Sequence, residues 1–132
     1  MKMTLENVLI IHDFLEMISK RKFPVQMSYI ISKNFKKFEE EKALIEKSRI
    51  DLNEQYCERD EEGNPKIEND FYVFTEENLE KYRAEYRPYL QTEIEMEIHK
   101  IPFAEIWKLE EARYDALSPD EITKLEFMLE EE

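Results

Sequence analysis

The chain has 132 residues, of which 39% are charged and 42% are hydrophobic, and its formal net charge at pH 7 is −13. This length and apolar content predict a single domain over residues 1–132 and exclude wholesale disorder. The single Cys excludes a disulfide framework, and no apolar run approaches the ~20 residues that a membrane span needs.

The first predicted element is a helix over residues 4–19. Thr4 is a suitable N-cap, and Glu6 places a negative charge in the first turn, where it suits the helix dipole. Apolar residues recur at three- and four-residue steps along one face. The basic run of residues 20–22 and then Pro24 end this pattern. Because the chain enters this amphipathic pattern directly, we expect no secretory signal and a cytoplasmic location.

A longer helix is predicted over residues 25–56, which contain neither Gly nor Pro. Phe35, Phe38, Ile45 and Leu52, the apolar row, recur at three- and seven-residue steps. Such a helix would be roughly 48 Å long, whereas a compact domain of this size is about 36 Å across. We therefore expect it to overhang its own domain, to bend, or to pack against a second copy. Residues 1–56 would form a helical hairpin.

Residues 57–132 are expected to mix short strands with helices. Gly63-Asn64-Pro65 predicts a turn, and Ile67 with residues 71–74 has the composition of a short hairpin. Thr75 predicts the start of a helix that Pro88 should end or kink.

A strand is predicted over residues 92–101, because apolar side chains alternate there with glutamates. Glu93, Glu95 and Glu97, the carboxylate row, would face solvent. Residues 106–109 predict a short helical or irregular segment, and Ser118-Pro119 predicts the start of a short terminal helix. The fold class is therefore α+β: a long helix packed on an N-terminal helix, with a small antiparallel sheet and short C-terminal helices.

The order of these segments resembles an uncharacterised family of small proteins from bacteriophages and prophages of Gram-positive bacteria. The residues that carry the resemblance are Leu5-Glu6-Asn7, Phe14-Leu15, Gly63-Asn64-Pro65, Glu93-Ile94-Glu95-Met96-Glu97-Ile98, Lys100-Ile101, Leu117-Ser118-Pro119, Leu125-Glu126 and Met128. The resemblance implies a phage or prophage origin and a protein that acts in the infected or lysogenic bacterial host or during particle assembly. It implies no catalytic residue and no cofactor.

The residues themselves also give little support for catalysis. His12 falls on the apolar side of the first helix, and strand parity puts His99 on the solvent face beside Glu97. Cys57 lies outside any metal or nucleophile motif, and the single Gly argues against a glycine-rich phosphate loop. We therefore predict a non-enzymatic protein with no catalytic residue, no metal ligand and no cofactor.

The charge distribution, the apolar row and the carboxylate row limit the classes of partner that we expect. Residues 1–60 carry 11 basic and 11 acidic side chains, whereas residues 61–132 carry 8 and 21. This excess disfavours direct contact with nucleic acid or an anionic membrane. The first hypothesis is therefore a protein that contacts other proteins and forms a homo-oligomer through the apolar row. The alternative is an acidic, DNA-mimic-type inhibitor of a host nucleic-acid enzyme or defence complex, with the carboxylate row as its contact. Simple core packing and a solvated strand face are the alternative explanations of the two rows.

Overall fold

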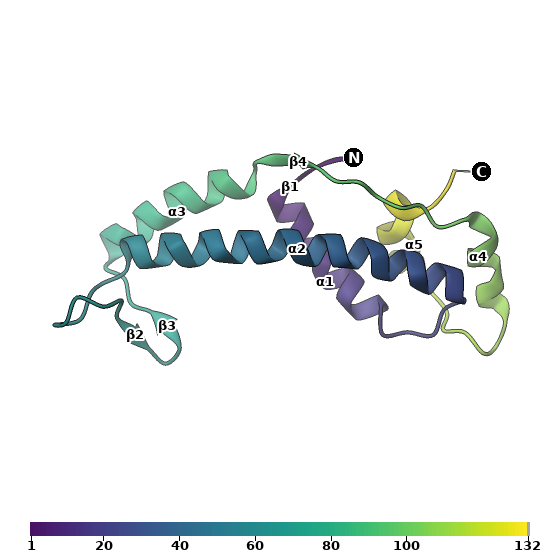
Figure 1. The fold of residues 1–132 in the computed structure, drawn as a ribbon, viewed down its shortest axis with the longest axis horizontal. Coiled ribbons are helices and arrows are strands. Elements are labelled where there is room, and N and C mark those ends of the chain that lie inside the picture. The colour runs from purple at the N-terminus through teal and green to yellow at the C-terminus, as the bar shows by residue number, and fades with distance from the viewer. Residues whose placement is uncertain (132) are drawn as a thin grey trace.

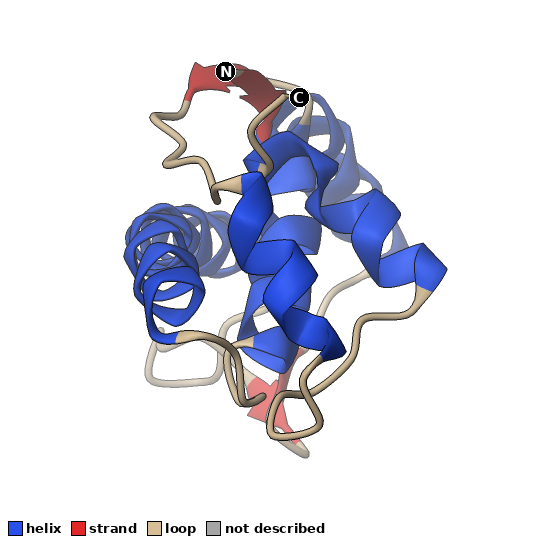
Figure 2. Ribbon diagram, turned by 90° about the vertical axis from the view of Figure 1, so that its right-hand side faces the viewer, coloured by secondary structure: helices blue, strands red, loops and turns tan. Residues whose placement is uncertain are grey.

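The computed structural model describes residues 1–131 and has an α+β fold in which helices predominate (Figure 1). Two two-stranded antiparallel sheets accompany the helices where the sequence predicted one small sheet. Figure 2 shows these sheets on opposite sides of the helices. The elements in chain order are β1 Lys2–Thr4, α1 Leu5–Ile18, α2 Val25–Tyr56, β2 Ile67–Glu68, β3 Phe71–Tyr72, α3 Glu76–Leu90, β4 Glu93–Glu95, α4 Phe103–Trp107, the 3-10 helix η1 Lys108–Glu110, α5 Pro119–Leu125 and the 3-10 helix η2 Glu126–Met128.

Helix α1 confirms the first predicted element. The Thr4 side chain accepts a hydrogen bond from the Asn7 N–H at 3.1 Å, so it caps the helix as expected. The apolar face is buried against α2 and the rest of the core. Strand β1, immediately before this helix, was not predicted.

Helix α2 covers the predicted range of residues 25–56, and it runs along most of the long axis of the molecule (Figure 1). Its N-terminal half packs against α1 and buries Met27, Ile31 and Phe38. Its C-terminal half lies beside α3, which follows the hairpin. We call this second part, with β2, β3 and α3, the arm. The long helix therefore overhangs the main core, and its own chain folds back along the overhang.

The predicted turn and hairpin are both present in residues 57–74. Gly63 has φ of +85°, and Asp60 Oδ1 accepts hydrogen bonds from the Glu62 and Asn64 N–H groups. Strands β2 and β3 pair antiparallel through a separate two-residue turn. Its residues, Asn69 and Asp70, have φ of 51° and 67°. Left-handed conformation at both positions matches the twist of a tight hairpin, and Asn and Asp tolerate it better than most residues.

Helix α3 starts after Thr75, whose side chain accepts a hydrogen bond from the Asn78 N–H. It continues two residues past Pro88, so the prediction that Pro88 ends or kinks the helix is wrong about the ending. Pro88 lies in the last turn, where its missing N–H removes only one hydrogen bond near the helix end. No residue of α3 is fully buried. Helix α3 therefore covers α2 only partly.

The strand predicted over residues 92–101 is shorter than expected. Only β4, Glu93–Glu95, forms a ladder, with Met3 opposite Ile94 in β1. The Met96 N–H also donates a hydrogen bond to the Met1 carbonyl at 2.8 Å. The partner strand provides no pairing beyond this point. The alternation itself is confirmed: Met96 is buried and Ile94 is half-buried, while the carboxylate row is exposed.

A buried asparagine takes the place of a strand partner for the next residues. The Asn34 side chain in α2 is fully buried. Its Nδ2 donates to the His99 carbonyl at 2.8 Å, and its Oδ1 accepts from the His99 N–H at 2.9 Å. One amide side chain thus satisfies both backbone groups of His99 and fixes this segment to α2.

The C-terminal helices close over the start of α2 (Figure 1). Ser118 and Glu121 form the predicted capping box at the start of α5. Glu121 also forms an ion pair with Arg21 in the α1–α2 connection, with Nη2 and Oε2 2.5 Å apart. The Ile101 N–H bonds the Met128 carbonyl, which joins the extended segment to the end of the chain.

We expect Asn34→Ala to lower the free energy of unfolding by about 2–4 kcal/mol, because both backbone groups of His99 would lose their partner away from water. Urea unfolding followed by circular dichroism measures this change. Asn53→Ala is the matched control: Asn53 is also buried in α2, but its Nδ2 bonds only the Arg49 carbonyl in the same helix. It should cost about 1 kcal/mol. Equal losses in the two variants would contradict the role assigned to Asn34.

Glu121 gives a prediction about pH. Its pKa is lowered from 4.5 to about 2, first by the hydrogen bond from Arg21 and then by that from the Ser118 backbone. A lowered pKa means that the carboxylate stabilises the fold above pH 4.5, and that this contribution is lost as the pH falls towards about 2. Glu121→Gln keeps a capping-box side chain and should lower the Tm at pH 7, with the difference shrinking over this interval.

Thermal unfolding of the parent chain and of Glu121→Gln at stepwise lower pH measures this difference in Tm. Asp120→Asn is the control, because it removes an equal charge from the same helical turn and Asp120 pairs with Lys124 instead. A Tm difference for Glu121→Gln that stays constant down to pH 2 would contradict the assignment.

Candidate functional site

The apolar row mostly belongs to the core of the chain itself. Phe38 and Ile45 are completely enclosed, and the Phe38 ring meets the Phe127 ring edge-on at 6.4 Å. Phe35 is half-buried and packs against His12, and Leu52 is half-buried in the arm. In this conformation Phe38 and Ile45 cannot meet a second copy, because side chains of the same molecule already cover them. Core packing therefore accounts for these two positions.

The carboxylate row is exposed as expected, but two of its members are engaged. Glu95 Oε1 lies 2.7 Å from the N-terminal amine of Met1, and Glu97 Oε2 lies 2.9 Å from Lys37 Nζ. The hydrogen bond from Lys37 lowers the pKa of the Glu97 carboxyl. Two cations of the same chain thus pair with two of the three negative charges in the row.

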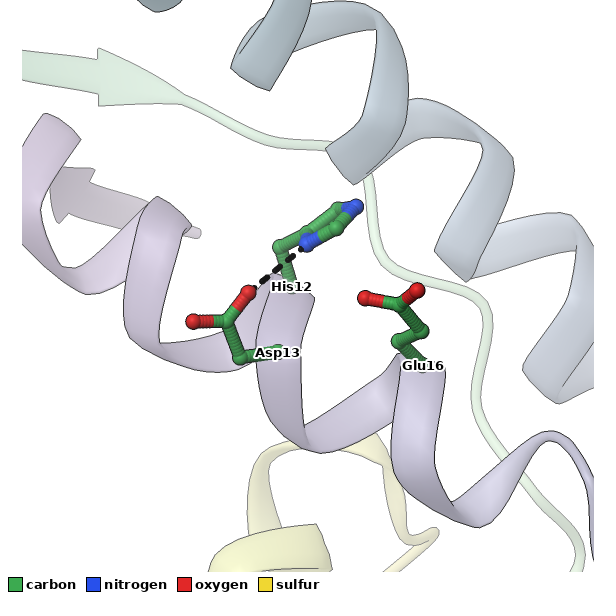
Figure 3. Close-up of side chains that lie close together, drawn as sticks. All are labelled: His12, Asp13 and Glu16. Carbon is green, nitrogen blue, oxygen red and sulfur yellow. Dashed lines mark hydrogen bonds and ion pairs between the residues drawn. The ribbon is translucent and has the colours of Figure 1, made fainter. Parts of the chain in front are cut away.

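A cluster that the sequence did not predict lies between α1 and α2. His12 and Glu16 are one turn apart on α1, and Asp13 lies beside them (Figure 3). His12 Nδ1 is 3.1 Å from Asp13 Oδ1, and His12 Nε2 is 3.9 Å from Glu39 Oε1 on α2. Lys42 Nζ is 3.6 Å from Asp13 Oδ1. We call these five residues the His12 cluster.

Electrostatics within the His12 cluster favour the ionised form of Asp13. The hydrogen bond with His12 is the largest effect and lowers the pKa of Asp13, burial opposes it, and the charge of Lys42 lowers the pKa further by a smaller amount. The cluster borders an open hollow of about 430 Å³, lined by His12, Glu16, Glu39, Lys42, Ala43 and Glu46. It is not a closed, water-poor cavity of the kind that would favour acid–base chemistry. The i, i+4 spacing of His12 and Glu16 could have predicted that their side chains lie on one face of the helix. The approach of Glu39 could not be predicted, because it depends on how the two helices pack.

The other two reactive side chains are isolated from this cluster. His99 does not lie on the solvent face, as strand parity predicted: its Nε2 is buried and lacks a hydrogen-bond partner within residues 1–131. Parity failed because the ladder ends at Glu95 and the backbone at His99 turns towards Asn34. Cys57 is buried at the end of α2, and its Sγ lies 3.8 Å from the Glu54 carbonyl.

The arm carries apolar surface without a cover. Ile67 in β2 is 56% exposed and Phe71 in β3 is 74% exposed. Because Ile67 stands opposite Tyr72, and Phe71 opposite Glu68, each face of the hairpin presents one large apolar side chain. In the sequence these residues only indicated strands. Exposed apolar side chains that lie close together can mark a contact surface.

No family model, no curated protein and no solved structure matches this chain. Within residues 1–131, none of the helices combines the length and the apolar character needed to cross a membrane.

We expect Phe38→Ala to lower the free energy of unfolding by about 3–5 kcal/mol, because it would leave a cavity in the core. Leu44→Ala, on the exposed face of the same helix, should change stability by no more than about 0.5 kcal/mol. Chemical denaturation measures both values. If Phe38→Ala were as mild as the control, Phe38 would not be a core residue.

Proposed function

We propose that this chain is a non-enzymatic phage or prophage accessory protein that acts by protein–protein contact and forms a homo-oligomer. The order of its segments, which resembles small phage and prophage proteins, supports that origin and a place in the cytoplasm of the infected or lysogenic bacterial host. The acidic excess in residues 61–132 argues against a nucleic-acid or membrane partner.

The observation that carries the proposal is the uncovered hairpin on the projecting arm. Two-stranded hairpins are marginally stable by themselves, and the outer edge of a strand can present unpaired N–H and C=O groups to another chain. This hairpin also exposes Ile67 and Phe71. Helix α3, the neighbouring element of the arm, buries none of its residues fully. A second copy could pair its hairpin edge to edge with this one around a two-fold axis, which is the commonest symmetry of homo-oligomers. Such pairing extends both faces of the hairpin and so partly covers both Ile67 and Phe71.

This proposal changes the surface expected from the sequence. The sequence analysis placed the contact on the apolar row of α2, but Phe38 and Ile45 are enclosed by the same chain. The overhang that motivated the hypothesis remains, because the arm extends beyond the main core (Figure 1). The contact is therefore assigned to Ile67 and Phe71 at the hairpin.

The acidic-inhibitor alternative keeps one supporting observation, the concentration of the net charge of −13 in residues 61–132. Its proposed contact is weaker than expected, because Glu95 and Glu97 already pair with cations of the same chain. If Glu93, Glu95 and Glu97 formed such a contact, binding to a basic partner would fall steeply with salt and would be lost on charge reversal.

Light scattering after size exclusion tests the self-association. At tens of micromolar the chain should elute as an oligomer, and Ile67→Ser/Phe71→Ser should elute as a monomer with an unchanged circular dichroism spectrum. The control is Val25→Ser/Tyr29→Ser, which removes exposed apolar side chains at the opposite end of α2. It should remain oligomeric. A monomeric parent chain, or equal effects of the two double variants, would refute this contact.

A further inference from the structure

The two ring nitrogens of His12 each face a carboxylate, and a neutral imidazole can satisfy only one of them. Nδ1 lies 3.1 Å from Asp13 Oδ1, and Nε2 lies 3.9 Å from Glu39 Oε1. Neutral imidazole has one N–H donor, so its other nitrogen presents a lone pair to the facing oxygen. Two such acceptors repel each other unless a proton or a metal ion lies between them.

The imidazole is also held in place. The His12 side chain is only 5% exposed, and its ring packs against the Phe35 ring with centroids 5.1 Å apart. Within the described residues no hydrogen bond reaches Nε2, although the ring borders the acidic hollow between α1 and α2. This buried nitrogen-bearing ring distinguishes the His12 cluster from an ordinary patch of surface carboxylates.

We propose that His12, Asp13 and Glu16 form a binding site for one divalent metal ion of the zinc class. One ligand atom from each lies within 4.8 Å of the other two (Figure 3). Ligand atoms around a tetrahedral zinc ion stand about 3.4 Å apart, given metal–ligand distances near 2.1 Å. Nδ1 and Asp13 Oδ1 are already close to this separation. Glu16 is exposed, so rotation of its side chain is sufficient to complete the set.

The donor types and the surroundings both favour this class of ion. An imidazole nitrogen with two carboxylates suits zinc and similar transition metals better than magnesium or calcium. With the metal on Nδ1, the Nε2–H would point to Glu39. A carboxylate that is not itself a ligand commonly orients a metal-bound imidazole in this way. Three protein ligands leave a coordination position for water.

Removal of Lys42 should change the metal affinity in the opposite direction to removal of a ligand. The Lys42 Nζ lies 3.6 Å from Asp13 Oδ1 and supplies positive charge to the cluster. A divalent ion bound to Asp13 would displace this ammonium group, so the two cations compete. Removing the lysine should therefore strengthen metal binding, whereas removing a ligand should weaken it.

The first experiment is isothermal titration calorimetry of the untagged full chain with zinc chloride. The second is a titration with cobalt(II) followed by visible absorption, which identifies a four-coordinate site. One zinc ion should bind per chain. His12→Gln and Glu16→Gln should each weaken affinity about tenfold or more, and Lys42→Met should strengthen it about fivefold. Glu16→Gln changes an exposed side chain, so its result stands even if His12→Gln fails to fold.

Two control variants separate coordination from general attraction to an acidic chain. Glu40→Gln removes an exposed charge of α2 outside the His12 cluster, and His99→Gln removes the other imidazole. Neither should change the affinity. The proposal is overturned if the parent chain binds no zinc, if Glu16→Gln binds as tightly as the parent, or if Lys42→Met weakens binding. It goes beyond the proposed oligomer and is independent of it, because the hairpin variants should keep the zinc site.

Discussion

The fold depends on the two hydrogen bonds between the buried side chain of Asn34 and the backbone of His99. The chain leaves its sheet after β4 because β1 offers only three residues for pairing. Without a substitute, the next backbone groups would lie against the core with no partner, which is costly. Asn34 provides both a donor and an acceptor from within a helix. The path to α4 and α5 therefore starts from a fixed point on α2.

Helix α2 passes through two unequal environments. Along its N-terminal half, α1, the extended segment and the C-terminal helices enclose Met27, Ile31 and Phe38. Along the C-terminal half the neighbouring helix is α3, none of whose residues is fully buried. Its less exposed face carries a row of half-buried tyrosines, Tyr82, Tyr86 and Tyr89, with neighbouring ring centroids 5.5 and 6.2 Å apart. Local opening needs less free energy where fewer apolar contacts are lost. The arm is thus the part of the molecule in which a second chain can add most to stability.

The parts of the fold that local chemistry determines were predictable from the sequence. Caps at Thr4, Thr75 and Ser118 and the 3.6-residue periodicity located four helices, because these signals act over a few neighbouring residues. Strand β1 was missed because its partner lies about 90 residues away in sequence. For the same reason the sequence indicated neither the pairing of Asn34 with His99 nor the approach of Glu39 to His12. Only the α1 residues of the candidate site could be predicted from the sequence, because their spacing is local. The α2 residues could not be predicted, because their approach depends on how the two helices pack.

The uneven charge distribution is also connected with folding. Residues 61–132 hold the acidic excess, and several of their carboxylates reach cations of the balanced half; these pairs are Glu95 with the Met1 amine, Glu97 with Lys37, and Glu121 with Arg21. The exposed pairs of Glu95 and Glu97 contribute little to stability, whereas the less exposed pair of Glu121 with Arg21 joins α5 to the α1–α2 connection. The remaining carboxylates repel one another and keep the surface soluble. The acidity thus has a structural role that requires no basic partner, and this weakens the case for mimicry of nucleic acid.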